Sequence, residues 1–139
     1  MAIKYFKFKT KIFANSVIKD KYVARMQVET KIDLDKIAEI IEKRSTVSKG
    51  DIMAVLSELE STAAWLLEEG HPITLGILGT LYPTLEAMAM DTPEEVTNDT
   101  IKKFSCILKP SKFLKNRFKE VNFILGDNKV MEVKYKKNI

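Results

Sequence analysis

Hydrophobic and polar residues alternate with a period of two along the first part of the chain. In "IKYFKFKTKIF", residues 3 to 13, lysines separate aromatic and aliphatic residues, and the alternation returns in "KYVARMQVE", residues 21 to 29. A period of two is typical of β-strands. The segment between the two runs, "ANSVIKD", supplies turn-forming residues. The pattern therefore predicts an N-terminal β-hairpin over residues 1–32, with a loop of moderate length.

The hydrophobic period changes to nearly four after residue 32. Apolar side chains at 34, 37, 40 and 41 form one helical stripe, and Asp33 stands where a helix N-cap belongs. Ser48 and Asp51 resemble a capping box before a longer run that holds helical spacing for about five turns. Gly70 is placed to end that second helix. Because the link "STV" is so short, the two helices must form a hairpin or an angled pair.

Strand patterns return after residue 70. "HPITLGILGTLYPTLEAMAM", residues 71 to 90, predicts a strand with a bend or close backbone approach at Gly76 and Gly79, and with Leu85 among its inward positions. After an acidic stretch, "TIKKFSCILKP" predicts a second strand that Pro110 ends, followed by a short helix in "SKFLKNRFKEV". The tail "NFILGDNKVMEVKYKK" predicts two short strands about a "GDN" turn. The fold class is therefore α+β.

Composition supports a folded body without a membrane span. The chain has 139 residues, 45% of them hydrophobic, which fits a single folded unit with a core. No apolar run approaches the roughly 18 residues that a spanning helix needs. One cysteine, Cys106, excludes an internal disulfide and fits a reducing cytoplasm.

The net charge of +4 is unevenly distributed. Residues 1–32 carry +6, residues 33–99 carry −10, and residues 100–139 carry +8. Two basic ends around an acidic middle suit a surface that binds a polyanion such as nucleic acid. The lysines could equally serve to flank strands and prevent edge-to-edge aggregation. Charge alone leaves both interpretations open.

Signatures of catalysis and of metal binding are absent from the sequence. The only histidine, His71, stands beside Pro72 at a helix exit, where a structural role is the simpler interpretation. Cys106 is most simply a buried strand residue. No phosphate-binding loop and no His/Cys cluster with metal-ligand spacing occurs. We therefore expect no enzyme activity, no cofactor, no metal and no small-molecule substrate.

Two segments resemble the HU/IHF histone-like proteins of bacteria. They are "IAEIIEKRSTVSKGDIMAVLSELESTAAWLLEEGHPITLGILGTLYP" and "ILKPSKFLKNRF". Gly79 and Thr80 match the family's Gly-Thr pair, and Pro110 and Leu114 match its Phe-x-Pro-Gly-x-x-Leu segment. The chain resembles still more closely the variant HU-like proteins common in Bacteroidetes. In that group a hairpin beginning "MAIKY" precedes the helices, and the arm holds a "TPEEVT"-like stretch followed by "IKK".

The resemblance implies an HU/IHF-like fold for residues 33–120. This fold has two N-terminal helices, an antiparallel sheet with a projecting hairpin arm (about residues 82–104) and a short C-terminal helix. Residues 1–32 would be an added β-hairpin packed on the body, and residues 121–139 a tail of strands. The family forms intertwined homodimers, which would bury the apolar helix stripes. The alternative is a monomer in which the added strands cover the same surface.

The resemblance also implies a function. HU-type proteins of the nucleoid bind duplex DNA largely without sequence specificity and bend it. The positions that would hold phosphates here are Lys102, Lys103, Lys109, Lys112, Lys115 and Arg117. Pro93 would be the arm-tip proline, although it lies between Thr92 and Glu94 and not within a basic run. The alternative is a structural or protein-interaction module that kept the fold and whose acidic arm no longer binds DNA.

Overall fold

The computed structural model describes residues 1–132, which form two compact units. Unit 1 consists of residues 1–31 together with the chain from Lys119 onward, and unit 2 consists of residues 32–118. Unit 1 is a β-sheet, and unit 2 combines helices with a second β-sheet. The expected α+β class is therefore confirmed. Among the described residues, no helix is long and apolar enough to cross a bilayer.

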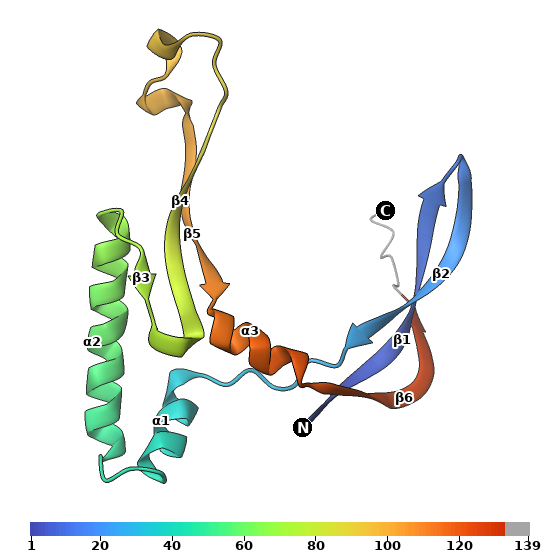
Figure 1. Cartoon of the computed structure of the whole chain (residues 1–139), viewed down its shortest axis with the longest axis horizontal. Coiled ribbons are helices and arrows are strands. Elements are labelled where there is room, and N and C mark those ends of the chain that lie inside the picture. Colours follow the sequence, from blue (N-terminus) through green and yellow to red (C-terminus); the bar gives the residue numbers. More distant parts are fainter. Residues whose placement is uncertain (133–139) are drawn as a thin grey trace, which may run out of the picture. The chain divides into compact units, whose positions relative to one another are not determined.

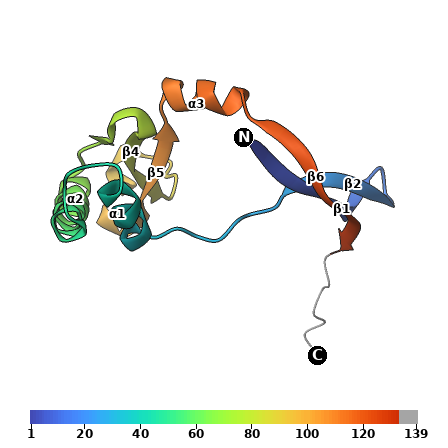
Figure 2. The same cartoon turned by 90° about the horizontal axis from the view of Figure 1, so that it is seen from below.

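Unit 1 is a three-stranded sheet in the order β2-β1-β6 (Figure 2). Strand β1 (Ala2–Ala14) runs antiparallel to β2 (Val17–Met26), so the expected hairpin is present. Its loop is shorter than predicted: Asn15 and Ser16 alone make the turn, both with positive φ (50° and 62°). A two-residue turn of this kind matches the twist of the flanking strands. The segment "VIKD" therefore begins β2 and does not belong to the loop.

The predicted tail hairpin is wrong over the described residues. Residues Asn122–Glu132 form one strand, β6, which pairs in parallel with β1. The "GDN" segment lies in a bulge, because the register shifts from Tyr5–Leu125 to Lys7–Val130. Within it, the Asp127 carboxylate accepts a hydrogen bond from the Lys129 N–H (3.1 Å), which makes a local turn without reversing the chain. The end of the predicted second strand lies outside the described residues.

The helices of unit 2 begin and end where the sequence predicts. Helix α1 (Leu34–Glu42) starts at Asp33, whose side chain accepts a hydrogen bond from the Lys36 N–H (2.9 Å). Helix α2 (Lys49–Glu68) starts at Ser48, whose Oγ accepts from the Asp51 N–H (3.2 Å) and donates to the Asp51 carboxylate (2.7 Å). Gly70 ends α2 with φ 87°. The N–H groups that follow the helix bond back to Leu67 O and Leu66 O, as in a Schellman motif.

Lys49 ties the start of α2 to α1. Its Nζ lies 3.0 Å from an Asp35 carboxylate oxygen and 3.4 Å from Glu39. These contacts, led by the hydrogen bond that Lys49 donates to Asp35, raise the pKa of Lys49 above its usual value. The hydrogen bonds from Lys36 and then Lys49 lower the pKa of the Glu39 carboxyl. A small apolar contact between the helices completes the junction, with Ala38 and Ile52 buried.

The sheet of unit 2 has the order β3-β4-β5, followed by helix α3 (Lys112–Lys119). The long strand expected in residues 71–90 is divided into β3 (Ile73–Thr74) and β4 (Gly79–Ala87) by a 3-10 turn, Gly76–Leu78. Strand β5 (Ile101–Pro110) pairs antiparallel with β4. Gly79 confirms the expected close approach, because a Cβ at this position would lie 2.2 Å from the Lys109 carbonyl oxygen.

Strands β4 and β5 continue beyond the rest of unit 2 as a projecting hairpin (Figure 1). Its tip, residues 88–100, contains two 3-10 turns, Pro93–Glu95 and Asn98–Thr100. Thr100 is buried, and its hydroxyl donates to the Thr97 carbonyl (2.7 Å). The Met88 N–H bonds to the Thr100 carbonyl (2.8 Å) and closes the base of the tip. The acidic stretch is therefore a folded tip and not a flexible linker.

The apolar core within one chain is small. Among the described residues, Phe8, Ala38 and Ile52 are the only buried hydrophobic side chains. Two expectations are wrong for this reason: Leu85 is 59% exposed, and Cys106 is also exposed. Both residues lie on strands of the arm, at positions where no other side chain of the unit buries them. The strand pattern correctly identified an apolar face, but one chain alone does not bury it.

Candidate nucleic-acid interface

The pairing of β4 with β5 sorts the arm side chains onto two faces. Thr80 lies opposite Lys109, Thr84 opposite Ser105, and Glu86 opposite Lys103. Because successive strand residues point to opposite faces, these residues share one side of the sheet. This side, called the polar face below, comprises Thr74, Thr80, Tyr82, Thr84, Glu86, Lys103, Ser105, Ile107 and Lys109. The other side is apolar and includes Leu81, Leu85, Phe104, Cys106 and Leu108.

Side-chain contacts join the members of the polar face near its base. The hydroxyl oxygens of Thr74 and Thr80 lie 3.1 Å apart across β3 and β4. The Lys109 Nζ lies 5.1 Å from the centroid of the Tyr82 ring, within the range of a cation–π interaction. This contact holds the ammonium group over the exposed sheet, while its remaining hydrogen-bond donors stay available. The face therefore offers a cation beside a row of hydroxyl groups.

Lys102 and Lys103 do not lie together on this surface. The register between β4 and β5 shifts between Glu86 and Ala87, where Lys103 pairs with Glu86 and Ile101 pairs with Ala87. Lys102 is the extra residue of this bulge, and a bulge redirects the side chains beside it. The structure thus brings Lys103 and Lys109 to the same face and leaves Lys102 apart from them. Directly opposite Lys103, the Glu86 carboxylate offsets part of its charge.

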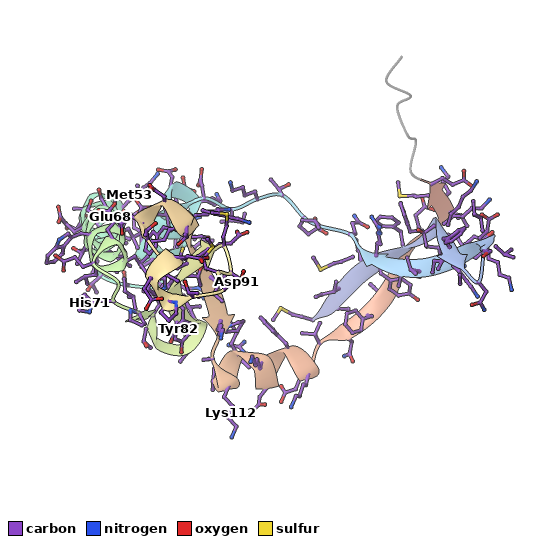
Figure 3. All side chains as sticks on the ribbon, turned by 90° about the horizontal axis from the view of Figure 1, so that it is seen from above. Met53, Glu68, His71, Tyr82, Asp91 and Lys112 are labelled. Carbon is purple, nitrogen blue, oxygen red and sulfur yellow. The ribbon has the colours of Figure 1, made fainter. Side chains whose placement is uncertain are left out.

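Ser111 fixes helix α3 to the end of the sheet. Its Oγ accepts a hydrogen bond from the Leu114 N–H (3.1 Å), as an N-cap does, and donates to the Ile77 carbonyl in the turn before β4. At about 100° per residue, Lys112, Lys115 and Lys119 fall within about 60° of one another around α3, and Arg117 lies about 140° from Lys112. Figure 3 shows Lys112 extending outward from α3. Two of the three expected α3 residues therefore share a stripe, and Arg117 does not.

The arm tip has the opposite charge. Pro93 is exposed at the start of a 3-10 turn, and the carboxylates around it are exposed as well: Asp91, Glu94, Glu95 and Asp99. Asp91 is labelled on the tip in Figure 3. No lysine or arginine occurs between residues 82 and 101 to balance them. The tip would therefore repel phosphate groups, whereas the base of the arm and α3 would attract them.

Several residues of this surface were not identified from the sequence. They are Thr80, Tyr82, Thr84 and Ser105 on the sheet, and Lys119 on α3. The sequence signal was the period of two in "TLYPT" and "SCILK", which places polar residues on one side of each strand. The pairing of β4 with β5 then joins the two polar rows into one face.

The described part of the chain gives little support for metal binding or for catalysis. It contains no group of three or more His, Cys, Asp or Glu residues placed to hold a metal ion. His71 lies 3.9 Å from a Glu69 carboxylate oxygen, and both side chains are largely exposed at the end of α2. This exposed pair lacks the buried setting that tunes a catalytic base.

Comparisons with known proteins agree with this architecture. Residues 1–124 match the family described as "HU domain fused to wHTH, Ig, or Glycine-rich motif". The structure is similar to the crystal structure of a Bacteroides vulgatus ATCC 8482 protein, described provisionally as a bacterial DNA-binding protein, with a TM-score of 0.61 and 14% sequence identity. That similarity covers 96% of this chain and half of the length of the other. No curated protein matches the sequence. Since the family match spans most of its length, the chain belongs to the family of HU domains fused to wHTH, Ig or glycine-rich motifs.

Proposed function

We propose that this chain is a non-catalytic DNA-binding protein with an HU/IHF-like fold, which holds duplex DNA by its phosphate backbone. The observation that carries the proposal is the placement of Lys103 and Lys109 on one exposed face with a row of hydroxyl groups. Membership of an HU-domain family supports it. In this proposal residues 33–120 are the HU-like domain, and the strands of residues 1–32 and from 121 onward extend it.

The chemistry of the polar face suits phosphate and not base recognition. Lysine and hydroxyl groups are common partners of phosphate oxygens, and such contacts position a protein without reading sequence. Of the side chains that read bases in the major groove, the bidentate arginine, asparagine and glutamine do not belong to the polar face, and its lysines act as point charges that also suit phosphate. Lys112 and Lys115 on α3 would add two further phosphate contacts. We therefore propose binding that is largely independent of DNA sequence.

The arm tip takes little part in this mode of binding. An arm that wedges a proline between base pairs needs neighbouring cations to hold the phosphates on either side. Pro93 is surrounded by carboxylates, which would bring negative charge against the backbone. Bending of the duplex in this proposal therefore relies on one-sided neutralisation of phosphates by the arm base and α3, without intercalation.

A second copy of the chain is part of the proposal. Helix α2 exposes a set of large apolar side chains (Val55, Leu59 and Trp65), and the apolar side of the arm sheet exposes Leu85, Phe104 and Leu108. A body of this size with so few buried apolar side chains gains stability by association. We propose that unit 2 forms a homodimer that buries these side chains and presents two polar faces to DNA in the cytoplasmic nucleoid.

A salt titration against duplex DNA tests the proposal. The log of the affinity should fall linearly with the log of the salt concentration. The Lys109→Ala/Lys112→Ala/Lys115→Ala variant removes three phosphate contacts from each protomer, and should reduce the magnitude of the slope for the dimer by about 5.4, since each lost contact removes about 0.9. The Lys36→Ala/Lys43→Ala/Arg44→Ala variant loses the same charge from α1 and its C-terminal end, and should leave the slope within about one unit. Equal effects of the two variants would refute a defined contact surface.

The acidic tip favours one alternative, a protein-interaction module that kept the fold. In that case the tip carboxylates would meet a basic protein, and the chain would show no affinity for duplex DNA even at about 50 mM salt, where electrostatic binding is strong. Absence of binding under that condition would refute the DNA proposal. Replacement of Asp91, Glu94 and Glu95 by Ala distinguishes the two functions, because it would weaken a protein contact and would not weaken DNA binding.

A further inference from the structure

The sheet of unit 1 has one apolar end that nothing in the unit covers. Ile3 pairs with Phe123, and Tyr5 pairs with Met26 on one side and Leu125 on the other. These side chains point to the same face of the sheet, together with Ala24. All of them except Leu125 line an open hollow of about 320 Å³, which is also bordered by Arg25. Met26 (53% exposed) and Phe123 (67%) stand out beside it. This set of residues is called the apolar patch below.

On the opposite face of the same sheet, the aromatic residues contact one another and are covered by a neighbouring arginine. Phe6 and Phe8 contact each other edge to face, with ring centroids 6.4 Å apart. The Arg25 guanidinium lies 3.8 Å from the Phe8 centroid and covers that ring, which is buried. This face also carries Lys4, Lys19 and Lys21 and no carboxylate. This face is therefore strongly basic, although Ile124 and Met131 on β6 are also exposed on it (46% and 53%).

The charges beside the apolar patch are partly balanced. Lys9 lies on the same face and contacts both neighbouring strands, 3.5 Å from Asp20 and 3.3 Å from Glu132. These contacts, led by the hydrogen bond with Glu132, raise the pKa of Lys9 above its usual value. Lys7 and Lys11 also lie on this face, where Lys7 donates to the neutral Asn128 side chain (3.1 Å) and Lys11 pairs with Asp20. Three lysines therefore stand against two carboxylates, and a second copy of this face meets less repulsion than a second copy of the basic face would. A second copy of the basic face would oppose four cations with four cations.

A small molecule is not the occupant that this hollow fits. Its lining lacks the several converging polar groups that fix the orientation of a small molecule. An apolar protein surface matches it better.

We propose that the apolar patch packs against the apolar patch of a second copy of this chain. Contact of one surface with its own copy is the arrangement that a two-fold axis produces. One face of this sheet, three strands wide and about ten residues long, measures about 14 by 34 Å. This area of about 480 Å² falls below the roughly 800 Å² that each partner buries in a standard interface.

The patch is therefore a second contact within the dimer, and in this respect it rests on the dimer proposed for unit 2. Joining two copies through unit 2 raises the effective concentration of one patch for the other, so a small contact suffices. The patch contact in turn lowers the Kd of the dimer below that of a dimer held by unit 2 alone.

Sedimentation of the full chain without DNA tests this contact, using two substitutions on β2. Met26→Lys places a charge in the patch, and Val23→Lys places the same charge on the opposite, basic face, where Val23 pairs with Phe8 and is 40% exposed. Met26→Lys should raise the dimer Kd by about tenfold or more, because a charge would lose its water in the contact. Val23→Lys should change the Kd by about twofold at most, as expected for an exposed site.

Equal effects of the two substitutions, or an unchanged Kd for Met26→Lys, would overturn the proposal, as would a monomeric wild-type chain. Phe123→Ser, on a different strand and at a largely exposed side chain, should reproduce the Met26→Lys effect while circular dichroism shows an intact sheet. A salt titration of each variant with DNA separates this contact from DNA binding. If the Met26→Lys variant keeps both the dimer Kd and the DNA affinity of the wild type, the patch contact alone is refuted and the proposed DNA binding stands.

Discussion

Gly79 is the position where one added methyl group should destabilise the arm most. It begins β4, opposite Pro110 at the end of β5. An alanine Cβ there would lie 2.2 Å from the Lys109 carbonyl oxygen and 2.9 Å from the Pro110 Cα. Both atoms belong to the backbone, so no side-chain rotation relieves the contact. The backbone itself, with φ 132° and ψ −159°, is in a region that is essentially restricted to glycine.

The cost of Gly79→Ala has two parts. The backbone conformation costs about 1–3 kcal/mol for a residue with a side chain. Moving β4 away from Lys109 also weakens the hydrogen bond from the Leu75 N–H to the Gly79 carbonyl (2.8 Å) and the first rungs of the β4–β5 pair. One such bond contributes about 0.5–1.5 kcal/mol. The sum is about 3 kcal/mol.

Gly70→Ala provides the matched control. Gly70 also has a positive φ (87°), but no atom lies within 4 Å of its added Cβ. Only the left-handed conformation then costs stability, about 1–2 kcal/mol. The difference of about 1–2 kcal/mol between the variants corresponds to a Tm about 4–16 °C lower for Gly79→Ala, in a body of this size.

The assay is thermal unfolding followed by circular dichroism at 222 nm. All samples need one protein concentration, because association shifts the Tm. A Tm for Gly79→Ala equal to or above that of Gly70→Ala would refute the reasoning. It would show that the backbone of β5 can move at Lys109 without a loss of stability, and that the base of the sheet does not hold the arm rigidly.

Two further predictions concern the helix junction and the arm tip. The folded pKa of Glu39 is lowered by Lys36 and Lys49, so its contribution to stability is present above the unfolded pKa and is lost as the pH falls through the folded value. Glu39→Gln should therefore lower the Tm at pH 7, and the difference from the wild type should shrink as the pH falls through the folded pKa of Glu39; a constant difference would contradict this. At the tip, Pro93→Ala should leave the affinity for duplex DNA unchanged, and Asp91→Asn/Glu94→Gln/Glu95→Gln should raise it at low salt, both measured by fluorescence anisotropy. A tenfold loss with Pro93→Ala would show that the tip wedges into DNA.

The helix boundaries were predictable because their signals are local. Asp33 and Ser48 each bond to an N–H three residues later, and Gly70 adopts a conformation that favours glycine over other residues. Each interaction joins residues within one turn of the chain. The two lysine-rich strands were predictable for the same reason, since a period of two is a property of neighbouring residues.

Long-range pairing was not predictable in this way. Strand β6 pairs with β1 over a sequence separation of more than 100 residues, and the "GDN" segment forms a bulge because β1 continues beside it. A turn signal such as Gly126-Asp127 fits both a hairpin and a bulge, and the neighbouring strand decides between them. The exposure of Leu85 and Cys106 has a related cause: alternation marks a face as apolar but does not say which chain covers it.

The candidate site was partly within reach of the sequence. Helical geometry alone separates Arg117 from Lys112 and Lys115. The grouping of Lys103 with Lys109, and the separation of Lys102 from both, depend on the bulge between Glu86 and Ala87. A shift of register by one residue would move every side chain of β5 to the other face. The composition of the polar face therefore follows from pairing, which the sequence of β5 alone does not determine.

The folded tip changes what the arm can do for DNA binding. Its base is closed by the Met88–Thr100 hydrogen bond, and Thr100 is buried in a tip that carries four carboxylates and no cation. These contacts lie within the tip, so its order does not depend on bound DNA, and little conformational entropy remains to be lost there on binding. Because the charge changes sign between the tip and Lys103, the proposed mode of binding has a duplex attracted to the arm base and repelled beyond it. In that mode the arm would limit how far DNA extends along the sheet, and would not grip it from the far side.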